Sequence, residues 1–257
     1  RTQYGRKFRF RSPENVVDEI EQVVKAHHID EIYFDDDSLA LNRPRILKIC
    51  ELIGKRKIKV KWIPQCRVSS MDEEVVKAMK RAGCHYIRFG VESGSQKMLD
   101  IMKKGTTLAQ IKRAFDLCRR VGIKTQAFFL FGIPGETQRT IKETIEFAKK
   151  LKADSAQFAI AIPHPGTELY RICKERNWLR FGNWEDFSAC NSLIETDNLS
   201  REDVENARIR AYRKFYFRLS YILRTALKIH SWQEFKATTK SARSIIDRMS
   251  FFQRSNR

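Results

Sequence analysis

Charged side chains stand directly after apolar segments at three places in the sequence. The acidic run Asp35–Asp37 follows "EIYF", Arg67 follows "KWIPQC", and Glu92 and Ser93 follow "IRFGV". Carboxylates can bind an ammonium group and a guanidinium can bind a carboxylate, so together these residues would suit a zwitterionic ligand. Each place also has a purely structural explanation, since acids cap helices and a surface arginine can pair with a neighbouring helix.

Two further apolar segments end in glycine and proline. Residues 128–131, "FFLF", precede GIPGE at Gly132–Glu136, and residues 158–162, "FAIAI", precede PHPG at Pro163–Gly166. The GxxG spacing is not a Walker loop, because no Lys-Ser/Thr pair follows it. His164, between two prolines, is interpreted as a loop residue rather than a ligand. Gly132–Glu136 is therefore either a strand-to-helix turn or part of a cofactor site.

The cysteines show no metal-binding pattern. There are six of them, without a CxxC or CxxxCxxC spacing: Cys50, Cys66, Cys84, Cys118, Cys173 and Cys190. We therefore predict no metal site within these residues, and reduced thiols as in a cytosolic protein. No Ser-His-Asp arrangement is visible, so no catalytic residue is assigned.

The elements that position these residues alternate between helix and strand. A helix over 12–27 precedes five strand-like segments, each followed by a helical pattern, at 29–37, 59–67, 85–93, 124–132 and 155–163. This alternation predicts a parallel sheet with right-handed crossovers, either an open sheet or a βα barrel. The carboxyl ends of parallel strands meet at one edge, so the polar segments should come together there.

Several helix ends carry capping signals. Ser12 predicts the start of the first helix, and Gly122 predicts the end of the helix over 107–122. Ser70 and Glu73 have the spacing of a capping box, which predicts a further helix start at Ser70.

Residues 200–250 are predicted to be helical and to lie outside the strand–helix part. Ser200 with Asp203 begins the first helix, whose apolar positions recur at steps of three or four: Val204, Ala207, Ala211, Phe215 and Leu219. The basic positions are assigned to its other faces: Arg208, Arg210, Arg213, Lys214 and Arg218. A second helix is predicted from the apolar positions Trp232, Phe235, Ile245 and Ile246.

The net charge of +19 is concentrated at the ends of the chain. Residues 1–11 carry five Arg/Lys and no acid, and residues 201–257 carry fourteen Arg/Lys against five Asp/Glu, a net of +9. Such ends suggest nucleic acid, an anionic membrane surface or an acidic partner, and equally a basic solvated surface. The hydrophobic fraction of 42% excludes wholesale disorder, and no apolar run is long enough for a transmembrane helix.

Five motifs occur in order along the chain: "FDDDSLALN", "QCRV", "FGVESGS", "FGIPGET" and "IPHPGTELY". With them, residues 5–180 resemble the core of the radical S-adenosylmethionine (radical SAM) enzymes. The resemblance implies an α/β fold, a partial parallel βα barrel with five of the six radical SAM strands plus a C-terminal α-helical extension. It divides the chain into a core domain, 1–180, and a loop with a basic helical extension, 181–257.

The same resemblance assigns S-adenosylmethionine-binding roles to residues at the first three strand ends. Asp36 and Asp37 match a segment that holds the methionine amino group, and Arg67 matches a residue close to the cofactor carboxylate. Glu92 and Ser93 match a segment near the ribose and the methionine moiety.

At the fourth strand end the resemblance implies an adenine site. Gly132 would let the backbone pass close to the adenine, and Ile133 and Pro134 would supply an apolar surface for it. Gly135 and Glu136 are assigned as turn and helix-start residues, because an acid at a helix N-terminus is stabilising.

The sequence departs from the family at its defining motif. The CxxxCxxC motif that binds a 4Fe–4S cluster is absent from these residues. In related sequences a segment like "GRKFRFRSPENVV" follows that motif, so we expect a chain that begins just downstream of the cluster loop. Without the cluster the chain alone is predicted inactive, while the full-length protein would be a radical SAM enzyme.

The segment "AYRKFYFRLSYILRTALK" resembles the tail of the cobalamin-binding radical SAM subgroup. Many of its members are methyltransferases or act on lipids and other apolar molecules, and they carry a B12-binding domain before the core. The resemblance thus implies a small-molecule or lipid-like substrate and cobalamin bound by an upstream domain. The reduced cysteines predict a cytoplasmic protein, and the basic tail suggests peripheral contact with an anionic membrane surface.

Two alternatives stay open. A cluster-less paralogue could use its basic ends to bind RNA or an acidic protein. An unrelated βα-barrel enzyme with a phosphate ligand is disfavoured, because the chain is too short to supply strands 7 and 8 of such a barrel.

Overall fold

The computed structural model describes residues 9–182 and 191–227, together with 229, 231, 236, 238–240 and 242–243. The chain divides into two compact units, Arg1–Phe129 with Lys150–Ser155, and Leu130–Lys149 with Ala156–Arg257. Strand β5 (Lys124–Phe131) runs from the first unit into the second, so the division falls inside a strand and not in a linker. The predicted division at residue 180 stays a prediction.

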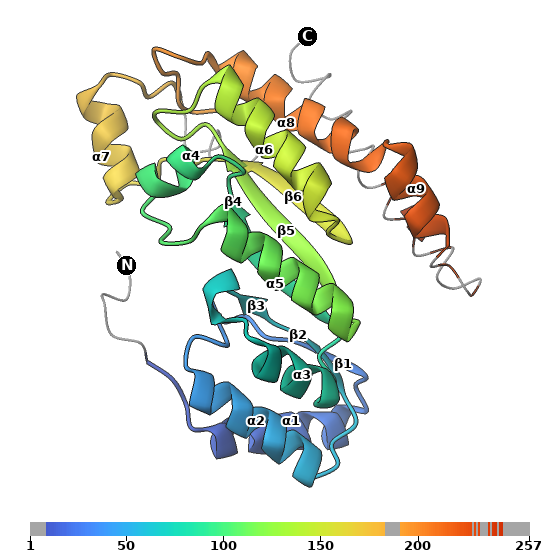
Figure 1. Cartoon of the computed structure of the whole chain (residues 1–257). Coiled ribbons are helices and arrows are strands. Elements are labelled where there is room, and N and C mark those ends of the chain that lie inside the picture. The colour runs from blue at the N-terminus through green and yellow to red at the C-terminus, as the bar shows by residue number, and fades with distance from the viewer. Residues whose placement is uncertain are drawn as a thin grey trace. The chain divides into compact units, whose positions relative to one another are not determined.

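Helices and strands alternate in the first unit, as the sequence predicts (Figure 1). The elements before β5 are α1 (Pro13–His27), β1 (Glu31–Tyr33), α2 (Arg43–Lys55), β2 (Lys61–Ile63), β3 (Gln65–Cys66), a 3₁₀ helix (Val68–Ser70), α3 (Glu73–Arg81), β4 (Tyr86–Glu92), α4 (Gln96–Ile101) and α5 (Leu108–Val121). The short helix α4 adds to the predicted pattern.

The second unit begins with the end of β5. It then contains most of α6 (Gln138–Leu151) and of β6 (Ser155–Ile160), followed by α7 (Glu168–Glu175), α8 (Arg201–Tyr216) and α9 (Leu219–Ala226). Helices α8 and α9 confirm the predicted helical extension over their own residues. The predicted apolar positions Trp232, Phe235, Ile245 and Ile246 lie outside the described residues.

The strands form two sheets, β1-β2 and β3-β4-β5-β6. The pairs β1–β2, β3–β4 and β4–β5 are parallel, with Glu31 opposite Lys61 and Gln65 opposite Arg88. No closed barrel forms among the described strands. The predicted α/β class with parallel strands is confirmed, and the arrangement is consistent with a partial barrel.

The strand predicted at residues 59–67 is two strands in the structure. Pro64 separates β2 from β3, and a proline has no N–H to donate to a neighbouring strand. Its carbonyl still accepts a hydrogen bond from the N–H of Arg88 at 3.0 Å. As a result β2 pairs with β1, while β3 pairs with β4.

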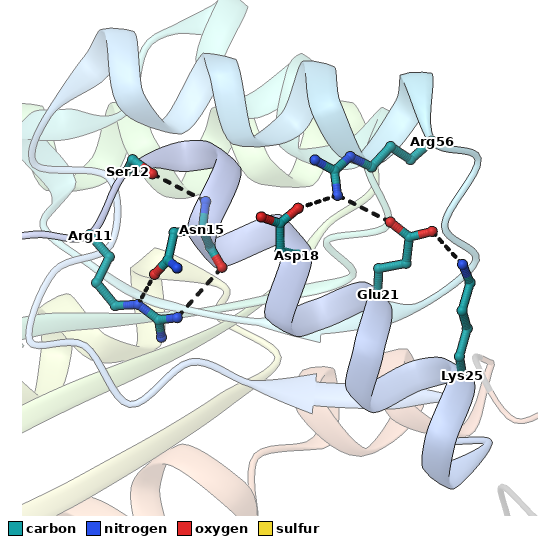
Figure 2. Close-up of polar contacts among 7 residues, drawn as sticks. All are labelled: Arg11, Ser12, Asn15, Asp18, Glu21, Lys25 and Arg56. Atoms are coloured by element: carbon teal, nitrogen blue, oxygen red, sulfur yellow. Dashed lines mark hydrogen bonds and ion pairs between the residues drawn. The ribbon is translucent and has the colours of Figure 1, made fainter.

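Helix α1 begins where its sequence predicts. Ser12 is the N-cap, and its hydroxyl accepts a hydrogen bond from the N–H of Asn15 at 3.1 Å (Figure 2). Arg56, which follows α2, pairs with Asp18 at 2.6 Å and with Glu21 at 3.1 Å. These pairs join α1 to α2 at an exposed surface, where water and salt screen ion pairs, so they add little to stability.

The capping box predicted at Ser70 and Glu73 is wrong. Ser70 ends the 3₁₀ helix, and Asp72 is the N-cap of α3, where its carboxylate accepts from the N–H of Val75 at 2.9 Å. Serine and aspartate cap helices about equally well. The 3₁₀ turn occupies Ser70 and leaves Asp72 as the residue that caps α3.

Helix α5 packs on one face of β4. Ile87, Phe89 and Val91 of β4 are buried, and the ring of Phe89 lies 5.1 Å from that of Phe115 on α5. The alternate residues of β4, Arg88 among them, are only partly buried. The face that carries them is therefore the less buried of the two.

In the second unit α8 packs along β6. The hydroxyl of Tyr216 donates to the carbonyl of Ala156 at 2.7 Å and accepts from its N–H at 2.9 Å. The ring of Tyr212 packs edge-on against Phe158 at 5.2 Å. Side-chain hydroxyls thus occupy backbone groups of β6 that would otherwise be open to pairing with another strand.

The predicted apolar face of α8 is confirmed at Val204, Ala207, Ala211 and Phe215, which are buried. Leu219, which begins α9, is 69% exposed, so the stripe does not continue there. None of the helices in the described part of the chain has the length and apolarity needed to span a bilayer.

Arg208, which the sequence assigns to a face other than the apolar one, lies on the buried side of α8. Arg208 is buried, and its Nε donates to the carbonyl of Phe158 at 3.0 Å. A carbonyl acceptor at this distance compensates for some of the hydration that the guanidinium loses.

Candidate functional site

The end of β4 is held in an unusual backbone conformation. Glu92 has φ of 68°, a region that non-glycine residues rarely occupy. The pairing with β5 shifts register between Gly90 and Glu92, which marks a β-bulge or similar irregularity. Bulges and left-handed residues redirect side chains, and they occur often at functional sites.

Lys104 binds the Glu92 side chain. Its Nζ lies 2.6 Å from Oε1 of Glu92, and both side chains are largely buried. A Cβ atom at Gly90 would lie 2.6 Å from the same oxygen and 3.1 Å from Nζ. Only glycine at position 90 leaves room for the ion pair as it stands.

Arg67 joins the same cluster through the backbone. Its guanidinium donates to the carbonyl of Lys104 at 2.8 Å. The structure therefore brings together Arg67 and Glu92, two of the predicted residues, with Lys104 between them. The sequence reasoning missed Lys104. In the sequence it is part of a basic pair before Gly105, and such pairs occur elsewhere in the chain, so nothing marks it as a site residue.

Asp36 and Asp37 are exposed in the segment that follows β1. This segment is held to β3 by a hydrogen bond of 3.1 Å from the N–H of Leu39 to the carbonyl of Gln65. Burial lowers the pKa of Arg45, and the negative charge of Asp36 opposes that change. No hydrogen bond or ion pair among the described residues joins these aspartates to the Lys104 cluster.

Ser93 is buried beside Glu92, and its hydroxyl accepts from the N–H of Ser95 at 3.1 Å. Ser93 therefore shapes the turn that leads into α4.

Gly132–Pro134 lie in the second unit, where Gly132 closes a turn. Gly132 has φ of 84°, and a Cβ atom there would lie 3.2 Å from Val204. Its N–H donates to Oε2 of Glu136 at 2.6 Å. Ile133 packs against the apolar cluster that includes Ala161 and Cys173. Glycine is thus required at 132 by its backbone conformation as well as by its neighbours.

The sequence predicts Glu136 as a helix-start residue, but in the structure Glu136 precedes helix α6 and is buried. It is 2% exposed, and burial raises its pKa to about 8. Helix α6 begins only at Gln138, and the carboxyl of Glu136 bonds back to Gly132. Its place in the structure is to hold the Gly132 turn.

The described cysteines do not fit an iron–sulfur cluster. Cys50, Cys66, Cys84, Cys118 and Cys173 are all buried free thiols. Burial raises the pKa of each, to about 12 for Cys50 and Cys118. Cluster ligands are thiolates, and the described residues contain no group of three or more His, Cys, Asp or Glu that could hold a metal.

The comparisons with known proteins agree on one family. The family model of the radical SAM superfamily matches residues 1–148. The chain is 33% identical over 230 residues to an uncharacterized methyltransferase of Pyrococcus horikoshii, covering 90% of this chain and 50% of that protein. It is 29% identical over 221 residues to the anaerobic magnesium-protoporphyrin IX monomethyl ester cyclase of Rubrivivax gelatinosus, covering 85% and 40%.

Solved structures lead to the same fold. The radical S-adenosylmethionine methyltransferase TsrM from Kitasatospora setae, with cobalamin and a 4Fe–4S cluster bound, matches with a TM-score of 0.60 and 25% identity, over 67% of this chain and 33% of that one. The cobalamin-dependent radical enzyme OxsB matches in fold, with a TM-score of 0.58 and 20% identity, over 91% of this chain and 41% of that one.

The chain spans about half the length, or less, of these curated relatives. The family model covers more than half of the chain, and a relative above 30% identity aligns over most of it. The predicted resemblance is therefore confirmed, and the chain belongs to the radical SAM superfamily.

Proposed function

We propose that residues 1–257 are the S-adenosylmethionine-binding core of a cobalamin-dependent radical SAM methyltransferase. The Glu92–Lys104–Arg67 cluster carries this proposal, because it places one carboxylate and two cationic side chains at a strand end of a radical SAM fold. Similarity to TsrM supports the methyltransferase class and a role for cobalamin. The 4Fe–4S cluster and the cobalamin would be held in the full-length protein by residues other than these.

The cluster residues fit the amino-acid end of the cofactor. Oε1 of Glu92 is taken by Lys104, so Oε2 is the oxygen that would accept from the cofactor ammonium. Lys104 and Arg67 would hold the cofactor carboxylate through charge-assisted hydrogen bonds. When bound, S-adenosylmethionine supplies the methyl group or radical for the reaction.

Asp36, Asp37 and Ser93 are proposed to complete the binding of the amino-acid end and the ribose. Gly132, Ile133 and Pro134 are proposed to hold the adenine. The chain alone should bind the cofactor weakly, since the iron that normally anchors the methionine end would be absent.

The test compares two glutamates in the full-length protein. Glu92→Gln removes the charge that would hold the ammonium, and it should weaken S-adenosylmethionine binding about tenfold or more, because a charge-assisted bond is worth about 1.5–3 kcal/mol. Glu73→Gln is the matched control, since Glu73 is an exposed residue of α3 paired with Lys77. Isothermal titration with equal affinity in both variants would refute the assignment.

A second proposal concerns an anionic membrane surface. Helix α9 exposes Leu219, Ile222 and Leu223, and Leu227 after it is 77% exposed. The C-terminal region that contains α9 carries the +9 charge excess. Apolar side chains beside basic ones suit peripheral contact with acidic lipids, and such contact would bring a cytoplasmic enzyme close to lipid-like substrates.

A further inference from the structure

Arg88 lies on the less buried face of β4. It alternates with Phe89, whose ring packs on α5, so its side chain projects from the opposite face. In the sheet it lies opposite Gln65 of β3 and Gln126 of β5. Arg88 and Glu92 share this face, with Arg88 nearer the start of the strand.

Two aromatic rings hold the guanidinium in place. Its central carbon lies 4.7 Å from the centre of the Phe128 ring and 5.0 Å from that of Tyr33. The NH1 group also donates a hydrogen bond to the Tyr33 hydroxyl. Cation–π contacts from two strands restrict the rotamers of a long side chain, so less entropy is lost when it binds a ligand.

The positive charge of Arg88 has no carboxylate partner in the described part of the chain. Its Nε is buried and makes no hydrogen bond. Removing a charge from water without an opposite charge or full hydrogen bonding is unfavourable. Lys104, a partly buried cation in the same unit, has Glu92 as its carboxylate partner. Arg88 lacks such a partner among the described residues, so its charge is available to a bound anion.

Arg218 is a useful comparison, because it also stacks on aromatic rings and has a buried Nε without a partner. Its NH1, however, donates to the carbonyl of Lys149 at 2.7 Å, near the C-terminus of α6, where the helix dipole favours a cation. Arg218 therefore has a structural role that Arg88 lacks.

We propose that Arg88 binds an oxyanion of the substrate, a carboxylate or a phosphate. The planar guanidinium can donate two parallel hydrogen bonds to either group. Tyr33, which is 43% exposed, would offer an aromatic surface to the rest of the molecule. That the bound anion belongs to a substrate rests on the proposed function. Anion binding at Arg88 is tested separately from that function.

The experiment is an NMR titration of the 257-residue chain that follows the arginine Nε–H signals. The probes are benzoate, phenyl phosphate and, as the neutral control, benzamide. The variants are Arg88→Gln, Arg88→Lys and the matched control Arg113→Gln, since Arg113 is exposed on α5. Even if an Arg88 variant folds poorly, the Arg88 signal of the unmodified chain still reports binding.

We expect benzoate or phenyl phosphate to shift the Arg88 signal, and benzamide to leave it unchanged. A response to benzoate alone assigns a carboxylate, and a response to phenyl phosphate alone assigns a phosphate. Arg88→Gln should weaken binding about tenfold or more, Arg88→Lys should weaken it less, and Arg113→Gln should not change it.

Three results would overturn the inference. The first is an anion-induced shift of the Arg113 signal as large as that of the Arg88 signal, and the second is binding of benzamide as tight as that of the anions. The third is competition between S-adenosylmethionine and benzoate, which would assign Arg88 to the cofactor carboxylate. If S-adenosylmethionine fails to bind the full-length protein in the isothermal titration while benzoate shifts the Arg88 signal of the 257-residue chain, the proposed function fails and the anion site stands. If the cofactor binds and neither anion shifts Arg88, only the anion site fails.

Discussion

Nζ of Lys104 lies 2.6 Å from Oε1 of Glu92, although twelve residues separate them in the sequence. The pair joins the strained end of β4 to the segment after α4. Both side chains are about three-quarters buried, with exposures of 21% and 26%. An ion pair so placed is screened less by salt than the surface pairs of α1.

Replacing Lys104 should weaken the binding of S-adenosylmethionine. Lys104→Gln removes a cation from the proposed carboxylate site and leaves Glu92 without its partner, so S-adenosylmethionine affinity in the full-length protein should fall about tenfold. Lys97→Gln is the control, because Lys97 is exposed on α4. Isothermal titration measures both, and an unchanged affinity in Lys104→Gln would remove Lys104 from the site.

Two glycine-to-alanine changes should differ in whether they mainly impair cofactor binding or mainly impair stability. At Gly90 the new Cβ meets the flexible ends of Glu92 and Lys104, so the ion pair is displaced at a small cost in stability, whereas cofactor affinity falls. At Gly83 the Cβ would lie 2.2 Å from the carbonyl oxygen of Val60, with φ of 99°. That backbone clash should cost about 2 kcal/mol or more.

Urea unfolding of the two glycine variants tests this contrast. A loss of stability in Gly90→Ala as large as that in Gly83→Ala would contradict the flexible-neighbour argument at position 90.

Glu136 should make stability depend on pH. Burial raises its pKa to about 8 in the folded chain, above the ordinary value of 4.5, so the folded state binds the proton more tightly than the unfolded state. The stabilisation is complete below about pH 4.5 and is lost as the pH rises through about 8. Urea unfolding across this window should show a steady decrease in the free energy of unfolding.

The variant Glu136→Gln keeps a carbonyl acceptor for Gly132 and cannot ionise. Its unfolding free energy should therefore vary less with pH than that of the unmodified chain. Glu202→Gln, at an exposed position in the first turn of α8, should leave the pH dependence as it was. The same slope in Glu136→Gln as in the unmodified chain would mean that another group titrates.

Vesicle co-sedimentation tests the proposed membrane contact of α9. Binding to anionic vesicles at low salt, lost as salt rises and absent with neutral vesicles, is the expected result, with each basic residue near the surface contributing about 1 kcal/mol. Leu223→Ser should weaken it, because Leu223 is 54% exposed, while Leu117→Val, a buried change on α5, should not. Failure to bind at low salt would eliminate the contact.

Much of the local structure follows from short-range rules. Ser12 caps α1, Gly122 ends α5 in a left-handed conformation, and Ser200 with Asp203 forms a capping box on α8. Each depends on hydrogen bonds or backbone angles within four residues, which is why sequence spacing predicts them. The choice of Asp72 over Ser70 shows the limit of this reasoning, because two good caps lay within reach of α3.

The sequence by itself determined the alternation of strands and helices, the family motifs, and which residues follow each strand. Only the tertiary structure decided that Pro64 divides a strand between two sheets, that Arg208 turns inward to Phe158, and that Lys104 binds Glu92. The physical reason is the range of the interactions. Periodicity and capping act over one or two turns, whereas pairing of a buried charge or a strand edge depends on segments that meet only when the chain has folded.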